Sequence, residues 1–166
     1  MRRFLIVLTG FAVSIAAENT LVGQTQSTSL TVSAVVVKNC TITTAPVAFG
    51  NYDSVAANAT TPLDGLGTIT VACTKGAPAK IGLGVGSNAE GTTRRMAGAA
   101  AEYLLYELYK DSAHATIWGD AADTALEIPA APNRNPRDYP VYGRVAAAQD
   151  AAVGNYTDTV VATVNF

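Results

Sequence analysis

The sequence predicts an all-β protein with the architecture of an immunoglobulin-like β-sandwich. Short runs of alternating apolar and polar residues recur along the chain, and turns rich in glycine and proline separate them. These runs amount to about eight short strands, and no stretch has a convincing helical period. A closed β-barrel is the alternative architecture.

Composition indicates one folded domain without a nucleic-acid partner. The 166 residues are 49% hydrophobic and only 14% charged, which is too apolar for a disordered protein. A formal net charge of −2 provides no basic field for binding phosphates. Nucleic acid is therefore not an expected partner.

The first residues have the three parts of a secretory signal peptide. Two arginines follow Met1, an apolar run covers residues 4–17, and small residues then offer cleavage points after Ala16, Ala17 or Gly23. The apolar run is shorter than the roughly 20 residues that a membrane-spanning helix needs. We therefore predict that residues 1–23 are a signal peptide and that the mature protein is exported.

Export changes the interpretation of the two cysteines, Cys40 and Cys73. The sequence has no histidine pair at metal-ligand spacing, and an oxidising compartment favours a disulfide. We predict a single Cys40–Cys73 bond. In the chain-entropy model, closing a loop of this length stabilises the fold by roughly 3–4 kcal/mol.

The first predicted strand covers Ser29 to Cys40, where apolar and small polar residues alternate. Its uniformly apolar face consists of Leu30, Val32, Ala34 and Val36. The alternation does not decide whether this strand joins a sheet of its own chain or a sheet of a neighbouring copy.

Strand and turn signals continue along the rest of the chain. The elements expected up to residue 101 are an extended stretch over 40–44, a short strand over 49–53 with a turn at Gly50, a loop over 55–65, strands over 67–74 and 79–86, and a loop over 87–101. Those expected after it are strands over 102–111, 116–120 and 125–129, a proline-rich loop over 129–140 that cannot be a central strand, and a strand over 141–147.

The final run, residues 156–166, has the cleanest alternation in the chain. Val160, Ala162, Val164 and Phe166 are expected to face inward. Because the sequence stops at Phe166, we expect this strand to have no following strand of its own, so that its edge must be covered by another molecule.

Groups that could carry catalysis are scarce, so we predict neither an enzyme nor a cofactor or metal site. The one histidine, His114, lies in a turn-like stretch and is expected to be a solvated loop residue. Glycines 82, 84 and 86 are not followed by the helix that phosphate binding requires, and are better explained by close packing of another backbone. Arg94 and Arg95 are expected to be solvated in a loop.

Six aromatic residues support an alternative function, a self-contained secreted β-sandwich that binds carbohydrate by stacking on sugar rings. They are Trp118, Tyr103, Tyr106, Tyr109, Tyr139 and Tyr142. Core packing is the competing role for most of them.

Several phrases occur in an order that resembles the spore coat protein U domain family, which includes major subunits of archaic chaperone–usher pili. The phrases are Asn39-Cys40-Thr41-Ile42, Phe49-Gly50-Asn51-Tyr52, Cys73-Thr74-Lys75-Gly76, Tyr103-Leu104 with Tyr106 and Leu108-Tyr109, Trp118-Gly119-Asp120, Tyr142-Gly143-Arg144, Gly154-Asn155-Tyr156-Thr157-Asp158-Thr159 and Val164-Asn165-Phe166. The similarity spans nearly all of the mature chain.

The resemblance implies an incomplete immunoglobulin-like sandwich that lacks its last strand. It also implies a periplasmic chaperone and an outer-membrane usher as partners, and assembly at the cell surface. The N-terminal segment of one copy, or of a sibling pilin, would fill the groove of the next by β-strand addition. The donor residues would be Leu30, Val32, Ala34 and Val36, and the candidates beside the groove are Val160, Ala162, Val164 and Phe166.

We therefore predict a structural subunit of a pilus or surface coat that polymerises by donor-strand complementation and supports adhesion and biofilm formation. A spore-coat structural protein and the carbohydrate-binding sandwich are the alternatives. The predicted domains are a signal peptide over 1–23, a donor segment over 24–38 and a sandwich over 39–166, with the division at Lys38–Asn39.

Overall fold

The computed structural model describes residues 23–166, and the chain divides into two units between Val35 and Val36. Residues 23–35 form no helix or strand and are exposed to solvent. Residues 29–39 of the predicted first strand pair with no sheet of their own chain, because regular pairing begins only at Cys40, and pairing with a neighbouring copy stays a prediction. A strand needs a neighbouring backbone, and residues 23–35 include no second segment to supply one. The predicted signal peptide lies, except for Gly23, outside the described residues.

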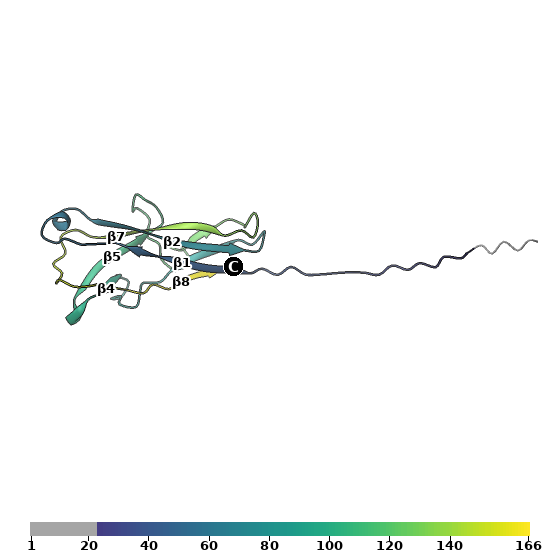
Figure 1. The fold of residues 1–166 in the computed structure, drawn as a ribbon, viewed down its shortest axis with the longest axis horizontal. Coiled ribbons are helices and arrows are strands. Elements are labelled where there is room, and N and C mark those ends of the chain that lie inside the picture. Colours follow the sequence, from purple (N-terminus) through teal and green to yellow (C-terminus); the bar gives the residue numbers. More distant parts are fainter. Residues whose placement is uncertain (1–22) are drawn as a thin grey trace, which may run out of the picture. The chain divides into compact units, whose positions relative to one another are not determined.

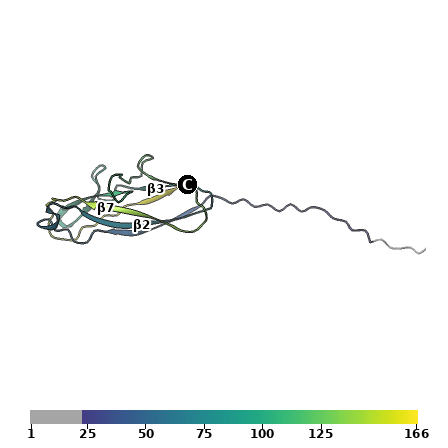
Figure 2. The same cartoon turned by 90° about the horizontal axis from the view of Figure 1, so that it is seen from above.

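Residues 36–166 form a sandwich of two antiparallel sheets, which confirms the predicted all-β fold class (Figure 1). The larger sheet has the strand order β1–β2–β7–β5–β4 and the smaller one β6–β3–β8. Figure 2 shows β3 in a different layer from β2 and β7. The strands are β1 (Cys40–Ala48), β2 (Leu63–Cys73), β3 (Ala79–Leu83), β4 (Arg95–Ala97), β5 (Tyr103–Tyr109), β6 (Leu126–Ile128), β7 (Arg137–Val145) and β8 (Ala162–Asn165), and the two short 3-10 turns are Ala57–Ala59 and Ala99–Ala101.

Side chains alternate between the two faces of each strand, so that one face of each strand points into the space between the sheets. On β5, Leu104, Tyr106 and Leu108 are buried while Tyr103 and Leu105 are exposed, as the sequence predicts. Other members of the buried core are Ile69, Val71, Ile81, Leu83, Trp118, Val141 and Val145. No helix within residues 23–166 is long and apolar enough to cross a lipid bilayer.

The predicted disulfide between Cys40 and Cys73 is present, with an S–S distance of 2.05 Å. The two cysteines lie directly opposite each other in the register of β1 and β2. Thr74 follows at once, and its hydroxyl donates to the Val37 carbonyl oxygen and accepts from the Asn39 amide, both at 3.1 Å. The backbone is therefore held in place where it enters β1.

Several predicted boundaries are wrong. The loop expected over residues 87–101 contains β4, a strand of three residues that is too short for alternation to reveal. Residues 49–53 form neither the expected strand nor a regular turn, although Gly50 has a positive φ of 77°. Residues 116–120 contribute only a single bridge, between Ile117 and Tyr109. The strands expected over 67–74, 79–86 and 156–166 are observed at Leu63–Cys73, Ala79–Leu83 and Ala162–Asn165.

The prediction that residues 129–140 cannot form a central strand is wrong for residues 137–140, because β7 begins at Arg137 and includes Pro140. β7 pairs with β2 along its whole length, but it pairs with β5 only from Tyr142 to Val145. The edge of β7 beyond β5 is therefore open at Pro140. No strand pairs with β7 on that side, so the missing N–H of Pro140 costs the sheet no hydrogen bond.

Trp118 joins the two sheets where residues 116–119 cross from one to the other. Its amide donates to the Leu108 carbonyl of β5, and its indole Nε1 donates to the Ile81 carbonyl of β3 at 2.8 Å. The side chain is fully buried. Trp118 and the buried Tyr106 therefore belong to the core and offer no stacking surface for a sugar.

Arg94 is buried at the same corner, so its predicted solvated position is wrong. Its guanidinium donates to the carbonyl oxygens of Leu83, Gly84 and Trp118 at 2.8–3.0 Å and pairs with the Glu107 carboxylate. A buried cation is stable only where its donors are satisfied. The ends of both sheets provide these acceptors, which the local sequence does not reveal.

Candidate functional site

The edge strands of the two sheets, β1 and β8, lie near each other (Figure 1). A groove runs beside them. β1 bonds only to β2, and β8 bonds only to β3. Within residues 36–166, no backbone hydrogen bond joins β1 to β8. Each strand therefore has one edge whose N–H and C=O groups are available to a further strand.

One part of the groove is a cavity of about 420 Å³. Residues 44–47 of β1 form one wall, and residues 156–160 with Ala162 form the other. Core side chains form the floor, and these are Ile69, Leu83, Tyr106, Leu108 and Val141. The cavity is therefore an apolar slot between two unpaired strand edges.

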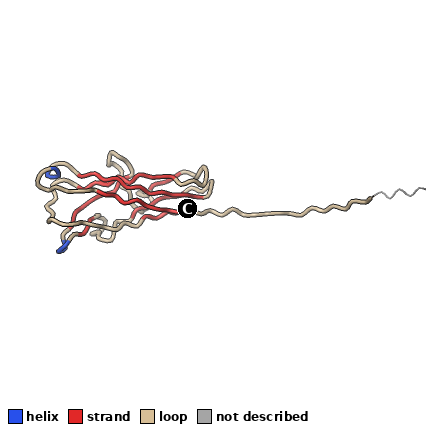
Figure 3. The backbone as a smooth tube through the Cα atoms, viewed as in Figure 1, coloured by secondary structure: helices blue, strands red, loops and turns tan. Residues whose placement is uncertain are grey.

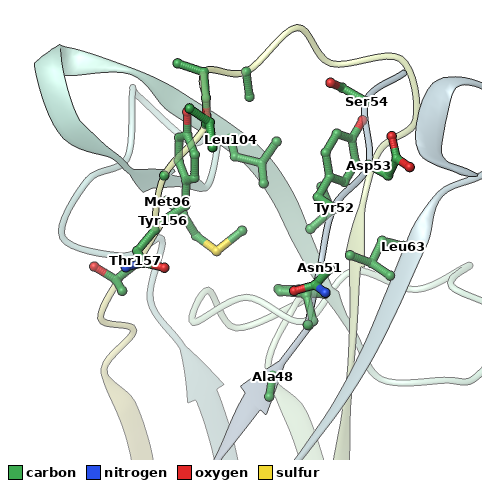
Figure 4. Close-up of a pocket in the computed structure, with 18 of the residues that line it drawn as sticks. Ala48, Asn51, Tyr52, Asp53, Ser54, Leu63, Met96, Leu104, Tyr156 and Thr157 are labelled. Atoms are coloured by element: carbon green, nitrogen blue, oxygen red, sulfur yellow. The ribbon is translucent and has the colours of Figure 1, made fainter. Parts of the chain in front are cut away.

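A second cavity, of about 990 Å³, continues the groove away from β8. Figure 4 shows Asn51 and Tyr52 on one side of it and Met96 and Tyr156 on the other. Five residues line both cavities, so the two are adjacent parts of one groove. They are Val47, Phe49, Met96, Tyr156 and Thr157.

Glycines allow β1 to bend over the floor of this groove. The register of β1 shifts at a bulge before Ala48, and Val47 and Phe49 then lie over β2 and β7. A Cβ at Gly67 would stand 2.6 Å from Val47 Cγ2, and a Cβ at Gly143 would stand 2.7 Å from Phe49 Cζ. No larger residue fits at either position without displacing these side chains.

One polar pair joins the floor of the groove to this wall. The Tyr106 hydroxyl donates to Asp158 Oδ2 at 2.7 Å. Burial, followed by this hydrogen bond, raises the pKa of Tyr106, so the hydroxyl stays neutral. Asp158 Oδ1 also accepts from the amides of Asn88 and Thr159. These bonds hold residues 156–160, the wall that precedes β8, in place, although no hydrogen bond within residues 36–166 joins this wall to β1.

The family assignment follows from the sequence as a whole. A family model described as the Spore Coat Protein U domain matches residues 26–163. The chain belongs to the Spore Coat Protein U domain family. Protein U of Myxococcus xanthus is 39% identical over 127 residues, which cover 71% of this chain and 70% of that protein. Membership in this family confirms the prediction of a structural, non-enzymatic protein.

A solved structure shares the fold of the Spore Coat Protein U domain. It is the CsuC–CsuE chaperone–tip adhesion subunit pre-assembly complex from the archaic chaperone–usher Csu pili of Acinetobacter baumannii. The match has a TM-score of 0.56 and 21% identity, and it covers 79% of this chain but only 40% of the Csu chain. It confirms the immunoglobulin-like sandwich, and the chain spans less than half of the Csu chain that it matches.

The structure brings only some of the predicted groove residues of this Spore Coat Protein U domain together. Val160 and Ala162 line the cavity beside β1. Val164 is half-buried against the core, whereas Phe166 is 48% exposed and lines a separate cavity with Lys38. The predicted groove residues include none from β1 or β4. They also omit Phe49 and Tyr52, which belong to one of the phrases that carry the family resemblance.

The predicted donor residues lie on an exposed apolar stretch. Leu30, Val32 and Val36 are each more than four-fifths exposed, and Ala34 is exposed as well. Such a concentration of exposed apolar residues is typical of a segment that becomes buried on binding. Their role as donor residues stays a prediction.

His114 is packed against the larger sheet, so the prediction of a solvated loop residue is wrong. A backbone turn at a φ of 56° folds it back, and its ring lies edge-on to Tyr109 at 5.1 Å and to Tyr142 at 6.3 Å. Its Nε2 atom lies 3.7 Å from Asp64 Oδ1. Residues 23–166 contain no cluster of ligands that could hold a metal ion.

The ion pair between Asp64 and Arg144 predicts a small pH-dependent contribution to stability. Arg144 donates to both carboxylate oxygens, at 2.6 and 2.8 Å, and this holds the pKa of Asp64 below its ordinary value of 3.8. Both side chains are partly exposed, so Asp64→Asn is expected to cost less than about 1 kcal/mol at pH 7. Because the pKa is lowered in the folded state, this contribution is complete above the ordinary pKa and is lost as the pH falls through the folded one.

Urea denaturation of the wild type and Asp64→Asn, at pH 7 and at low pH, measures this contribution. The difference in free energy of unfolding should shrink toward zero on acidification. Asp123→Asn, in an exposed loop, is the matched control and should have no effect at either pH. An Asp64→Asn difference that does not change with pH would contradict the assignment.

Proposed function

We propose that this Spore Coat Protein U domain is a structural subunit of a pilus or surface coat that polymerises by donor-strand complementation. The observation that supports the proposal is the apolar groove between two unpaired strand edges. The same chain carries an exposed amphipathic segment that pairs with no strand of its own unit. One copy, or a sibling pilin, supplies the segment, and the next copy supplies the groove.

The chemistry of the segment suits the groove. Main-chain groups of an inserted strand would bond to the free edges of β1 and β8, and alternate side chains would meet the core floor. Leu30, Val32, Ala34 and Val36 would face the floor, and Thr31 and Ser33 would face away. Burial of the four apolar residues contributes on the order of 5 kcal/mol, from which the cost of ordering the segment is subtracted.

Before assembly, the groove would need a temporary occupant. An apolar floor between open strand edges promotes aggregation. The similar Csu structure is, by its title, a chaperone–subunit pre-assembly complex, which supports a periplasmic chaperone as the first partner of this chain. An outer-membrane usher would follow, and the disulfide suits an oxidising compartment. Assembly at the cell surface would support adhesion and biofilm formation.

Charge placed on the apolar face of the donor segment tests the proposal. Leu30→Asp with Val32→Asp should abolish polymers, because two carboxylates would have to enter the apolar floor. Thr31→Asp with Ser33→Asp adds the same charge to the opposite face and should leave polymers intact. Negative-stain microscopy of cells that express the chain shows whether polymers form. Gel electrophoresis of heated and unheated samples shows whether the subunits form a ladder of heat-sensitive oligomers. Deleting Ser27–Val37 should likewise leave only monomers.

Two outcomes would contradict the proposal. Polymers that persist after the deletion or after the Leu30 and Val32 substitutions would exclude this segment as the donor. Equal loss in both double variants would show that charge, and not the apolar face, decides assembly. A coat layer in place of filaments in the micrographs would favour the spore-coat form of assembly that the family description suggests.

A further inference from the structure

We propose that successive subunits also meet end to end, with the acidic end of the acceptor against the basic end of the donor subunit. This inference rests on the proposed donor-strand assembly. The two surfaces are named the loop end and the base. The loop end comprises residues 49–62, 98–102 and 146–156, and the base comprises residues 37–39, 74–78 and 129–137.

The strand register places these two surfaces at opposite ends of the sandwich. At the base, Cys40 pairs with Cys73, and Arg137 pairs with Val71. At the other end of the same sheet, Leu63 pairs with Val145. Figure 3 shows the two short 3-10 turns of the loop end, drawn in blue, at the end of the sandwich opposite the C-terminus. β1 alone has nine residues, so the two ends are about 30 Å apart.

The two ends carry opposite charge. The charged residues of the loop end are all acidic, namely Asp53, Glu102 and Asp150. Those of the base are all basic, namely Lys38, Lys75, Arg134 and Arg137. Backbone amides of Ala56 and Val55 lower the pKa of Asp53, which keeps it ionised. Asp138, which follows the base in β7, is bonded to the Thr70 hydroxyl at 2.6 Å.

The linker between subunits is too short to keep these ends apart. With residues 30–36 in the groove of the acceptor, only Val37 and Lys38 precede Asn39. Thr74 holds Asn39 and Val37 at the base of the donor subunit. Three residues span at most about 10 Å from Val36 to Asn39. The base of the donor subunit must therefore lie against whichever end of the acceptor the donor strand leaves.

Charge decides which end that is. β1 leaves the base at Cys40, whereas β8 approaches it at Asn165, so the two strands run in opposite directions beside the groove. An inserted strand that left at the base would bring two basic surfaces together. A strand that left at the loop end would bring a basic surface against an acidic one, which favours association. We therefore infer a donor strand antiparallel to β8.

The loop end also has apolar residues that such a contact would cover. The side chains of Val55 and Val153 are 89% and 105% exposed, at the tips of two neighbouring loops. The base offers Pro78 and Pro132, which are exposed as well. The apolar loop tips of the acidic loop end could therefore pack against the exposed prolines of the basic base.

Zero-length carbodiimide cross-linking of filaments sheared from cells that express the full chain tests this contact. Amide links should form from Lys38 or Lys75 to Asp53, Glu102 or Asp150, and peptide mass spectrometry identifies them. The ends of one subunit are too far apart for such a link, so every link must join two subunits. Links should be absent from the monomers that the Ser27–Val37 deletion leaves.

A charge reversal gives the matched comparison. Glu102→Lys with Asp150→Lys should reduce the remaining links from the base to Asp53 at least several-fold. Asp120→Lys with Asp123→Lys makes the same charge change in the loop before β6 and should leave these links unchanged. Intact filaments without links between base and loop end, or with links that the loop-end reversal does not affect, overturn the inference and leave the proposed function standing. A wild-type chain that forms no polymers overturns both.

Discussion

Arg94→Met is expected to destabilise the domain by about 3–5 kcal/mol, the largest effect of any single substitution discussed for this protein. Methionine fills part of the space but donates no hydrogen bond. The carbonyl oxygens of Leu83, Gly84 and Trp118 then lose their buried donor, and Glu107 loses its cation. Each unsatisfied buried group costs about 1–3 kcal/mol, and partial entry of water reduces the sum.

Chemical denaturation of the purified domain measures this loss, and Arg95→Met is the matched control. Arg95 is adjacent in sequence, but it pairs with the exposed Glu90 and lies over the ring of Tyr103. We expect its loss to cost about 1 kcal/mol or less. Equal effects of the two substitutions would show that the buried network at the corner of the sheets does not stabilise the fold as described.

Removal of the disulfide by Cys40→Ala with Cys73→Ala is expected to cost about 3–4 kcal/mol. The bond closes a loop between residues 33 positions apart, and it joins β1 to β2 at the base. The main effect is on the unfolded chain, which gains conformational freedom when the loop opens. A second effect is local, since β1 is an edge strand that is held on one side only.

Denaturation with and without a reducing agent measures the contribution of the disulfide. The reduced wild type should lose about as much stability as the double alanine variant, and the reducing agent should not affect that variant further. A double variant as stable as the oxidised wild type would contradict the entropic argument. Conversely, a loss seen only in the alanine variant would indicate a packing defect at these positions.

Buried polar networks hold the walls of the groove, although its two edge strands do not bond to each other. The Arg94 corner and the Tyr106–Asp158 pair hold the two sheets and the wall ahead of β8 without any bond from β8 to β1. These bonds fix the positions of the two sheets and of this wall without any contribution from a strand in the groove.

Local signals predicted the parts of the fold that depend on nearby residues. Alternation identified β5 with its buried face, and Gly50 has the positive φ that glycine tolerates. Cys40 and Cys73 were paired correctly because only one pairing exists. The first feature follows from the periodicity of the side chains, the second from the conformational freedom of glycine, and the third from the number of cysteines.

Long-range packing accounts for the incorrect predictions. Arg94 and His114 have loop-like neighbours in sequence, yet other strands bury them. Pro140 is tolerated in β7 because β5 ends before reaching it. No local pattern records where a neighbouring strand stops or which carbonyl oxygens converge on a guanidinium.

The sequence by itself determined that this protein is all-β, with one disulfide and an apolar segment ahead of its first paired strand. Period-two alternation and composition are sufficient for the strands and the apolar segment, because these depend on residues close together in the chain. The disulfide follows because two cysteines allow only one pairing. Only the tertiary structure decided that Val47, Phe49 and Met96 share a groove with Val160, and that the acidic and basic loops lie at opposite ends. Those relations depend on strand order and register, which are set by contacts between residues far apart in sequence.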